Sequence, residues 1–250
     1  MKLIVIGLYF LTTSVWGFNH DHGAYSKVLK SHVVRKGPQT LVDYKELKKA
    51  PADLDSYIVS LGEISKKEFE SWSKDQKLAT LINGYNAWTL KLITKNYHVT
   101  SIKDIGPFYS TPWKIKFISW LGEKVSLDDI EHNIIRKQFK EPRIHFALVC
   151  AAIGCPSLQQ EPYLPKELDH QLEKASKEFL NDKNKNRAEV TGNKLNLQVS
   201  SIFNWYGQDF GTREELIAYI VKGMGLTEID KSKRVSVSYL DYDWSLNEKK

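Results

Sequence analysis

Apolar residues recur at helical spacing over much of the first half of this chain. The strongest case begins at Ser73, where Ser73 and Gln76 stand in the positions of a capping box. From Leu78 to Ile93 apolar residues return at steps of three and four, which predicts a long helix with an apolar face. Similar patterns predict further helices within 18–36, on either side of Pro51 within 41–61, over 126–139, over 165–180 and after Thr212.

Strands are expected mainly in the second half. Apolar and polar residues alternate over 112–120, 195–199 and 235–239, which is typical of half-buried strands. We interpret the continuous apolar run 144–150 as a central strand. Helices outnumber strands, and the two do not alternate regularly. The predicted fold class is therefore α+β, a mostly helical single domain with a small, mainly antiparallel sheet.

The first residues have the features of a secretory signal peptide. Lys2 precedes an apolar stretch, Leu3 to Leu11, and residues suited to a cleavage site follow up to Gly17. We place the cleavage after Gly17, so that 1–17 is the signal and 18–250 the single domain. The apolar stretch is too short to span a bilayer comfortably, and no later stretch approaches that length. The expected protein is periplasmic or secreted, with no integral membrane segment after signal removal.

Composition narrows the class of partner. Hydrophobic residues make up 42% of the 250 residues, which is ample for a buried core. The formal net charge is +6, but the lysines are scattered and form no basic stripe. Nucleic-acid binding needs such a stripe together with a recognisable module, so we do not expect it.

The two cysteines of the chain, Cys150 and Cys155, lie at either end of a short segment that ends in a Gly-Cys-Pro turn. Three interpretations stay open: a disulfide or inert thiols, a catalytic thiol, or part of a metal site. Cys150 follows apolar residues and is expected to be packed, whereas a turn cysteine such as Cys155 is better placed to meet a substrate. With His132 and His145 the cysteines match no standard zinc spacing, so no metal site is assigned.

The catalytic interpretation makes Cys155 the nucleophile and His132 its general base. Glu131 or Asn86 would orient the imidazole, and backbone amides near Gly154 would stabilise an oxyanion. The structural interpretation of the same residues is a surface carboxylate and a half-buried histidine bonded to backbone.

The candidates for a positioning or binding role are Asn83, Asn86, His145 and Cys150. Asn83 and Asn86 lie one turn apart inside the apolar helix, where their amides need partners in a neighbouring loop or a ligand. On a strand over 144–150, His145 and Cys150 would point to opposite faces.

Several segments resemble the domain-of-unknown-function family 547 (DUF547). They are LINGYNAWTL (81–90), SLDDIEH (126–132), RIHFALVCAAIGCPSL (143–158), IFNWYGQDFG (202–211) and YLDYDWSLN (239–247). The resemblance runs from about 44 to 247, the expected core of the domain. Its pattern includes every candidate named above: Asn83, Asn86, Glu131, His132, His145, Cys150 and Cys155. It implies no activity, because the family is named for lacking one.

Three functions follow as hypotheses. The first is a thiol-dependent hydrolase or transferase that acts on envelope peptides or amides through Cys155. The second is a non-catalytic envelope binding module, in which a Cys150–Cys155 disulfide stiffens a ligand loop. The third is a thiol-redox protein. No cofactor is expected, and the partner is unknown beyond an envelope peptide or polymer.

Overall fold

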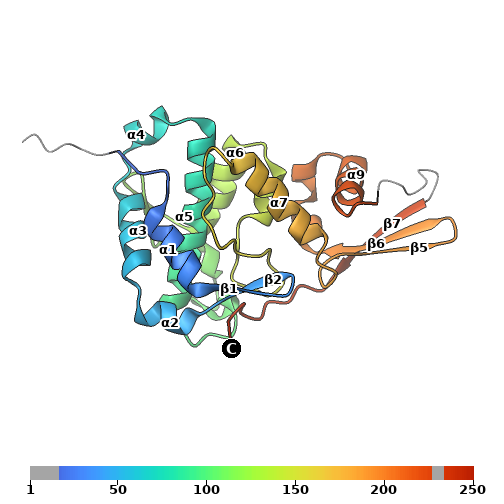
Figure 1. The fold of residues 1–250 in the computed structure, drawn as a ribbon, viewed down its shortest axis with the longest axis horizontal. Coiled ribbons are helices and arrows are strands. Elements are labelled where there is room, and N and C mark those ends of the chain that lie inside the picture. The colour runs from blue at the N-terminus through green and yellow to red at the C-terminus, as the bar shows by residue number, and fades with distance from the viewer. Residues whose placement is uncertain (1–16, 227–233) are drawn as a thin grey trace, which may run out of the picture.

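The computed structural model describes residues 17–226 and 234–250 (Figure 1). The fold is mostly helical with three small sheets, which confirms the predicted α+β class. In Figure 1 helices α1 to α5 gather at one end of the molecule, β5 to β7 project at the other, and α7 runs between them. The predicted signal peptide, up to residue 16, lies outside the described residues. In the described part of the chain, no helix is long and apolar enough to cross a membrane.

Most helices fall close to their predicted positions, but α4 and α8 were not predicted, and the helix expected over 126–139 is mainly a π-helix. They are α1 (Gly23–His32), α2 (Tyr44–Lys49), α3 (Ala52–Gly62), α4 (Lys66–Ser71), α5 (Lys74–Lys95), α6 (Arg136–Gln138), α7 (Leu168–Leu180), α8 (Ile202–Tyr206) and α9 (Arg213–Gly223). A π-helix, Asp129–Ile135, runs directly into α6. Short 3-10 helices occupy Ile102–Asp104, Pro112–Lys114, Pro142–Phe146 and Gly207–Phe210.

Helix α5 is the central element of the larger apolar core. Its capping box forms as predicted: Ser73 accepts a hydrogen bond from the backbone of Gln76, and the Gln76 side chain accepts one from the backbone of Ser73. Helices α2 and α3 and the π-helix pack around it. Because neighbours surround α5, polar residues as well as apolar ones are buried along it, including both asparagines.

In the described part of the chain, the sheets are two hairpins and one three-stranded sheet. Strands β1 (Val33–Lys36) and β2 (Gln39–Val42) pair antiparallel, as do β3 (Ile118–Trp120) and β4 (Glu123–Val125). In the third sheet β6 (Lys194–Ser200) pairs antiparallel with β5 (Arg187–Thr191) and parallel with β7 (Arg234–Leu240). The expectation of mainly antiparallel pairing is thus confirmed, with one parallel pair.

Helix α7 joins two apolar cores. Its first half contributes Leu168 and Leu172 to the core around α5, and its second half contributes Phe179 and Leu180 to a core with β6, α8 and α9. After β7 the chain returns to the first core as an extended segment, 241–247, whose Leu246 backbone N–H lies 2.8 Å from the carbonyl oxygen of Thr100. This returning segment brings residues from the end of the sequence beside the Gly-Cys-Pro turn.

Two predicted strands are wrong. Residues 144–150 are not a central strand: Pro142 opens a 3-10 helix that the side chain of Glu141 caps, and irregular backbone follows it. Residues 112–117 are likewise a 3-10 turn and a loop, and only 118–120 form a strand. In both places helices and loops cover the apolar residues, fully over 144–149 and partly over 113–117, so their spacing indicates burial and not a sheet.

Candidate functional site

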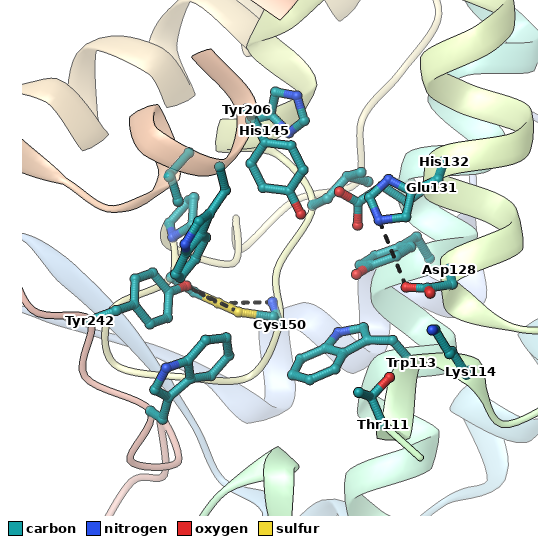
Figure 2. Close-up of a pocket in the computed structure, with 17 residues that line it drawn as sticks. Thr111, Trp113, Lys114, Asp128, Glu131, His132, His145, Cys150, Tyr206 and Tyr242 are labelled. Atoms are coloured by element: carbon teal, nitrogen blue, oxygen red, sulfur yellow. Dashed lines mark hydrogen bonds and ion pairs between the residues drawn. A yellow bond between two sulfur atoms is a disulfide. The ribbon is translucent and has the colours of Figure 1, made fainter. Parts of the chain in front are cut away.

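A cavity of about 340 Å³ opens between the π-helix, the Gly-Cys-Pro turn, helix α8 and the returning segment (Figure 2). Both cysteines line it, together with Glu131, His132 and His145. Figure 2 shows Cys150 and Tyr242 on one side of this space and Asp128, Glu131 and His132 on the other. The fold therefore gathers five of the seven predicted site residues around one cavity.

Aromatic side chains form much of the cavity wall. Trp205 of α8 lies 4.9 Å from Tyr242 and 5.8 Å from Trp244, between ring centroids. Trp113 extends the same group, with its ring centroid 5.7 Å from that of Trp244. Since these rings come from three distant segments, only the folded chain forms this wall. Flat aromatic surfaces of this kind suit a ligand with a flat or apolar face.

The cysteines form a disulfide, one of the alternatives that the sequence left open. Their Cα atoms are 6.1 Å apart, within the usual range for such a bridge. The expected exposures are reversed: Cys155 is fully buried, whereas Cys150 is half-buried. The reason is that the turn folds under the returning segment, where Gly154 donates its backbone N–H to the carbonyl oxygen of Asp243 at 2.8 Å.

Tyr242 is held directly against the bridge. Its hydroxyl oxygen lies 3.1 Å from the sulfur of Cys150 and 3.1 Å from the sulfur of Cys155. The ring packs on Gly154, where an added Cβ would lie 2.9 Å from a ring carbon. A residue with a side chain at position 154 would therefore displace Tyr242. Burial raises the pKa of Tyr242 well above its ordinary value, so its hydroxyl keeps its proton and can donate to sulfur.

The π-helix presents Glu131 and His132 to the cavity. It opens with a reciprocal pair: Asp129 donates its backbone N–H to the Ser126 hydroxyl, which in turn donates to the Asp129 carboxylate. The wider turns of a π-helix change which side chains share a face, and such segments are frequent at functional sites. Here Glu131 is buried and His132 half-exposed, and both line the cavity.

Two tyrosines engage the carboxylate of Glu131. The hydroxyl groups of Tyr85 and Tyr206 both interact with it. Burial first, and then the nearby charge of Glu131, raises the pKa of each phenol above its ordinary value. Both phenols therefore keep their protons and can donate to the carboxylate. A carboxylate has about four acceptor positions, which leaves capacity for a ligand donor.

His132 is oriented by charged neighbours. Its Nε2 atom lies 3.7 Å from the carboxylate of Asp128, and its Nδ1 atom lies 3.1 Å from Nη1 of Arg136. Since a guanidinium only donates, Nδ1 accepts, and the ring proton sits on Nε2 toward Asp128. Among the described residues, neither sulfur forms a hydrogen bond with His132 or His145. The histidine–cysteine contact of the catalytic interpretation is therefore not formed in this disulfide state.

The buried His145 belongs to a group with the half-buried Arg136 and Asp209 that sequence reasoning missed. Its Nε2 atom lies 2.7 Å from Asp209, and its ring stacks on Tyr206 with 4.0 Å between centroids. Arg136 donates two hydrogen bonds of 2.7 Å to the same carboxylate of Asp209. Burial lowers the pKa of His145 although Asp209 opposes this, so the ring is neutral near pH 7.

The aspartate itself stays charged. Burial alone would raise the pKa of Asp209, but hydrogen bonds from Arg136 and His145 hold it below the ordinary value. The signal for this group was present in the segment 202–211, which carries Tyr206 and Asp209. The group could not be predicted from the sequence, because no local spacing links that segment to His145.

Asn83 and Asn86 lie outside the cavity lining and hold loops in place. Asn86 donates to the carbonyl oxygen of Ala147 at 2.9 Å and accepts from the backbone N–H of Val149 at 2.9 Å. Asn83 makes the same pair of bonds with Tyr163, at 2.8 and 2.9 Å. The loop that Asn86 holds leads directly into Cys150. This is the structural role that the sequence offered as an alternative to ligand binding.

The cavity therefore offers binding groups and a disulfide bond. In the described part of the chain, no group of three or more His, Cys, Asp or Glu side chains is arranged to hold a metal ion. The aromatic wall can stack on a ligand, Glu131 can accept from it, and the bridge can exchange with a thiol that reaches Cys150.

Comparison with known proteins identifies one family. Residues 69–180 match the sequence model of the family described as "Protein of unknown function, DUF547", which confirms the resemblance over that range. The match contains every predicted site residue, from Asn83 to Cys155. Trp205, Tyr206 and Tyr242 lie beyond it. No curated protein and no solved structure matches the chain.

Proposed function

We propose a function from the chemistry of the cavity, because the family whose model residues 69–180 match has no assigned activity. The protein is an exported binding module that holds an envelope peptide, or a related amide-bearing ligand, between its aromatic wall and Glu131. The Cys150–Cys155 bridge stiffens the loop on which the ligand rests. The observation that carries the proposal is the joint presence of aromatic rings, a buried carboxylate and a disulfide around one cavity of about 340 Å³.

The chemistry of the lining supports an amide ligand. Glu131 is acceptor-only when ionised, so it favours a ligand with N–H groups. Trp113, Trp205 and Trp244 offer the flat apolar surface that usually supplies most of the contact area in such a pocket. The disulfide is consistent with the proposed export, because disulfides form and persist in oxidising compartments such as the periplasm or the exterior.

Ligand titration tests the proposal. Soluble peptides released from peptidoglycan are added to the oxidised protein, and tryptophan fluorescence is followed, since three tryptophans line the cavity. We expect saturable binding that Glu131→Gln weakens about tenfold, the effect of losing one hydrogen bond to a charged acceptor. Trp205→Ala should weaken binding too, and it carries little folding risk because Trp205 is 46% exposed.

The matched control is Glu123→Gln, on the exposed β3–β4 hairpin away from the cavity. It should bind as the unchanged protein does. The proposal is wrong if the unchanged protein binds none of these peptides, or if the Glu131 and Trp205 variants bind as tightly as the control.

A second candidate function is thiol chemistry after reduction of the bridge. It is favoured by one observation: two donors, the backbone N–H of Cys150 at 2.9 Å and the hydroxyl of Tyr242 at 3.1 Å, point at the sulfur of Cys155. Such donors stabilise a thiolate, and Cys150 is exposed enough for a reductant to reach. The reduced protein would then act as a thiol-redox protein, or as a hydrolase or transferase with Cys155 as nucleophile and His132 as base.

Activity with and without a dithiol reductant separates the two candidates. Thiol-dependent hydrolysis or transfer predicts cleavage of the same peptides only in the reduced protein, with loss in Cys155→Ser and retention in Cys150→Ser. Iodoacetamide labelling followed by mass measurement reports the state of both sulfurs. Absence of turnover in the fully reduced protein would eliminate the hydrolase or transferase, while reduction that weakens peptide binding would support the binding module.

A further inference from the structure

Phe18 contacts a residue fifty positions away in the sequence. Its backbone nitrogen donates to the Oε1 atom of Glu68, in helix α4, at 2.6 Å. The preceding residue, Gly17, is exposed. A short hydrogen bond from a backbone N–H at the start of the described residues to a carboxylate from a distant helix is a specific tertiary contact.

The side chain of Phe18 is also held. Its ring centroid lies 5.5 Å from those of His20, His22 and Trp72, in edge-on or tilted arrangements. Helix α4 and the turn after it supply Glu68 and Trp72, so one element holds both the backbone and the ring of Phe18. The start of the described chain is thus a docked element with its own cluster of partners.

Among the described residues, no lysine or arginine side chain pairs with Glu68. Within residues 17–226 and 234–250, Glu68 forms no ion pair with a lysine or arginine at 4.0 Å or less, although other acids on the same surface do, such as Glu70 with Lys66. A half-shielded carboxylate that receives a single N–H would gain from a positive charge at that nitrogen.

We propose that the Gly17–Phe18 bond is a processing site and that the new α-ammonium of Phe18 forms an ion pair with Glu68 in the mature protein. Water adds across the peptide bond, so Gly17 leaves with a carboxylate and the Phe18 nitrogen becomes –NH₃⁺. The agent is an endopeptidase of the signal-peptidase class that acts during export. This inference concerns a different part of the molecule from the cavity and stands or falls independently of its ligand.

Two independent observations converge on the same bond. The sequence pattern places cleavage after Gly17, with Val15 and Gly17 in the positions that favour small residues. The folded structure places the next nitrogen against a carboxylate. Cleavage would convert one N–H donor into three and add a positive charge at the nitrogen, so that the hydrogen bond to the carboxylate becomes an ion pair. Export would therefore complete an interaction that the precursor makes only in part.

The first experiment identifies the mature end. The full chain is expressed in a bacterium that exports it, and the purified protein is analysed by intact mass and N-terminal sequencing. We expect Phe18 as the first residue. Any other first residue, or retention of residues 1–17, overturns the proposal.

The second experiment measures the ion pair by a double-mutant cycle. One protein starts at Phe18, released from a fusion by a protease that leaves no extra residue. The other carries a short Gly-Ser extension ahead of Gly17, which moves the ammonium away. We expect Glu68→Gln to lower the melting temperature by about 2–4 °C more in the first protein than in the second.

Glu70→Gln, on the same helix, is the matched control and should affect both proteins equally. If Glu68→Gln lowers the melting temperature by the same amount in both, the ammonium makes no specific pair, and the proposal fails. Because the comparison is between two forms of one variant, a general loss of stability in Glu68→Gln cancels.

Discussion

At the residue scale, His22 shows how burial sets the charge of a side chain. It is 1% exposed, and its Nδ1 atom lies 2.8 Å from the hydroxyl of Tyr57. Burial, and then the neighbouring His20, lower the pKa of His22 to about 3. The folded protein therefore keeps this ring neutral at any pH above that value, whereas the unfolded chain protonates it near pH 6.5.

A pH-dependent stability follows from that difference. Between pH 6.5 and pH 3 the unfolded chain binds a proton that the folded chain does not. The stability contributed by neutral His22 is therefore complete above pH 6.5 and falls as the pH is lowered. The loss is roughly 2 kcal/mol between pH 6.5 and pH 5.

His22→Asn tests this, because asparagine tolerates the positive φ of 51° at this position. Urea unfolding at pH 7 and pH 5 should show a smaller acid loss in the variant than in the unchanged protein. His20, His32 and His145 also have lowered pKa values, so part of the loss stays. The control is His170→Asn at an exposed site. An acid loss equal to that of the unchanged protein would refute the assignment.

At the element scale, α5 acts as a frame for the loops that carry the site. The periodic apolar pattern predicts the helix, but the two asparagines on it do the positioning. Asn86 binds both a carbonyl and an N–H of the loop that leads into Cys150, and Asn83 binds the loop at Tyr163 in the same way. Each amide thus replaces the strand partner that its loop lacks.

Removing either amide leaves a buried N–H and a buried carbonyl without partners. Asn86→Ala should lower the free energy of unfolding by roughly 3 kcal/mol, and Asn83→Ala by a similar amount. Only Asn86→Ala should also weaken peptide binding and speed reduction of the bridge, because only its loop carries Cys150. Urea unfolding gives the stabilities, and the rate of bridge reduction gives the second readout.

The two variants control for each other, since the same chemistry is lost one helical turn apart. Equal rates of bridge reduction in both would mean that Asn86 stabilises the fold without positioning the cysteine loop.

The failed strand prediction at 144–150 has the same origin. An apolar run is compatible with any buried conformation, and the choice depends on which partners reach its backbone. Here Asn86 supplies those partners from a helix. Without the strand, side chains do not alternate between two faces over 144–150. His145 and Cys150 can therefore line the same cavity.

At the scale of the whole molecule, the cavity is assembled by the return of the chain. Segment 241–247 leaves β7, crosses the Gly-Cys-Pro turn and ends beside α2, where Tyr44 donates to the Asn247 side chain at 2.7 Å. Figure 1 shows the end of the chain beside the first helices. Tyr242 and Trp244 of this segment line the cavity.

Local patterns were enough for the long helices, although the short helices α4 and α8 were not predicted. Capping residues and apolar periodicity act within a few turns, so Ser73 and Thr212 marked the starts of α5 and α9 correctly. Chemistry-bearing residues could be named in the same way, because Glu131, His132 and the cysteines stand out within their own segments.

The partners of those residues were decided by the fold alone. Asp209 reaches His145 across 64 positions, and Tyr242 reaches the bridge across more than 80. Which cysteine is buried, which proton His132 carries and where the loop amides go depend on groups that no local spacing connects. Chain order specifies short-range hydrogen bonding and apolar faces, whereas burial and charge pairing arise only when distant segments exclude water together.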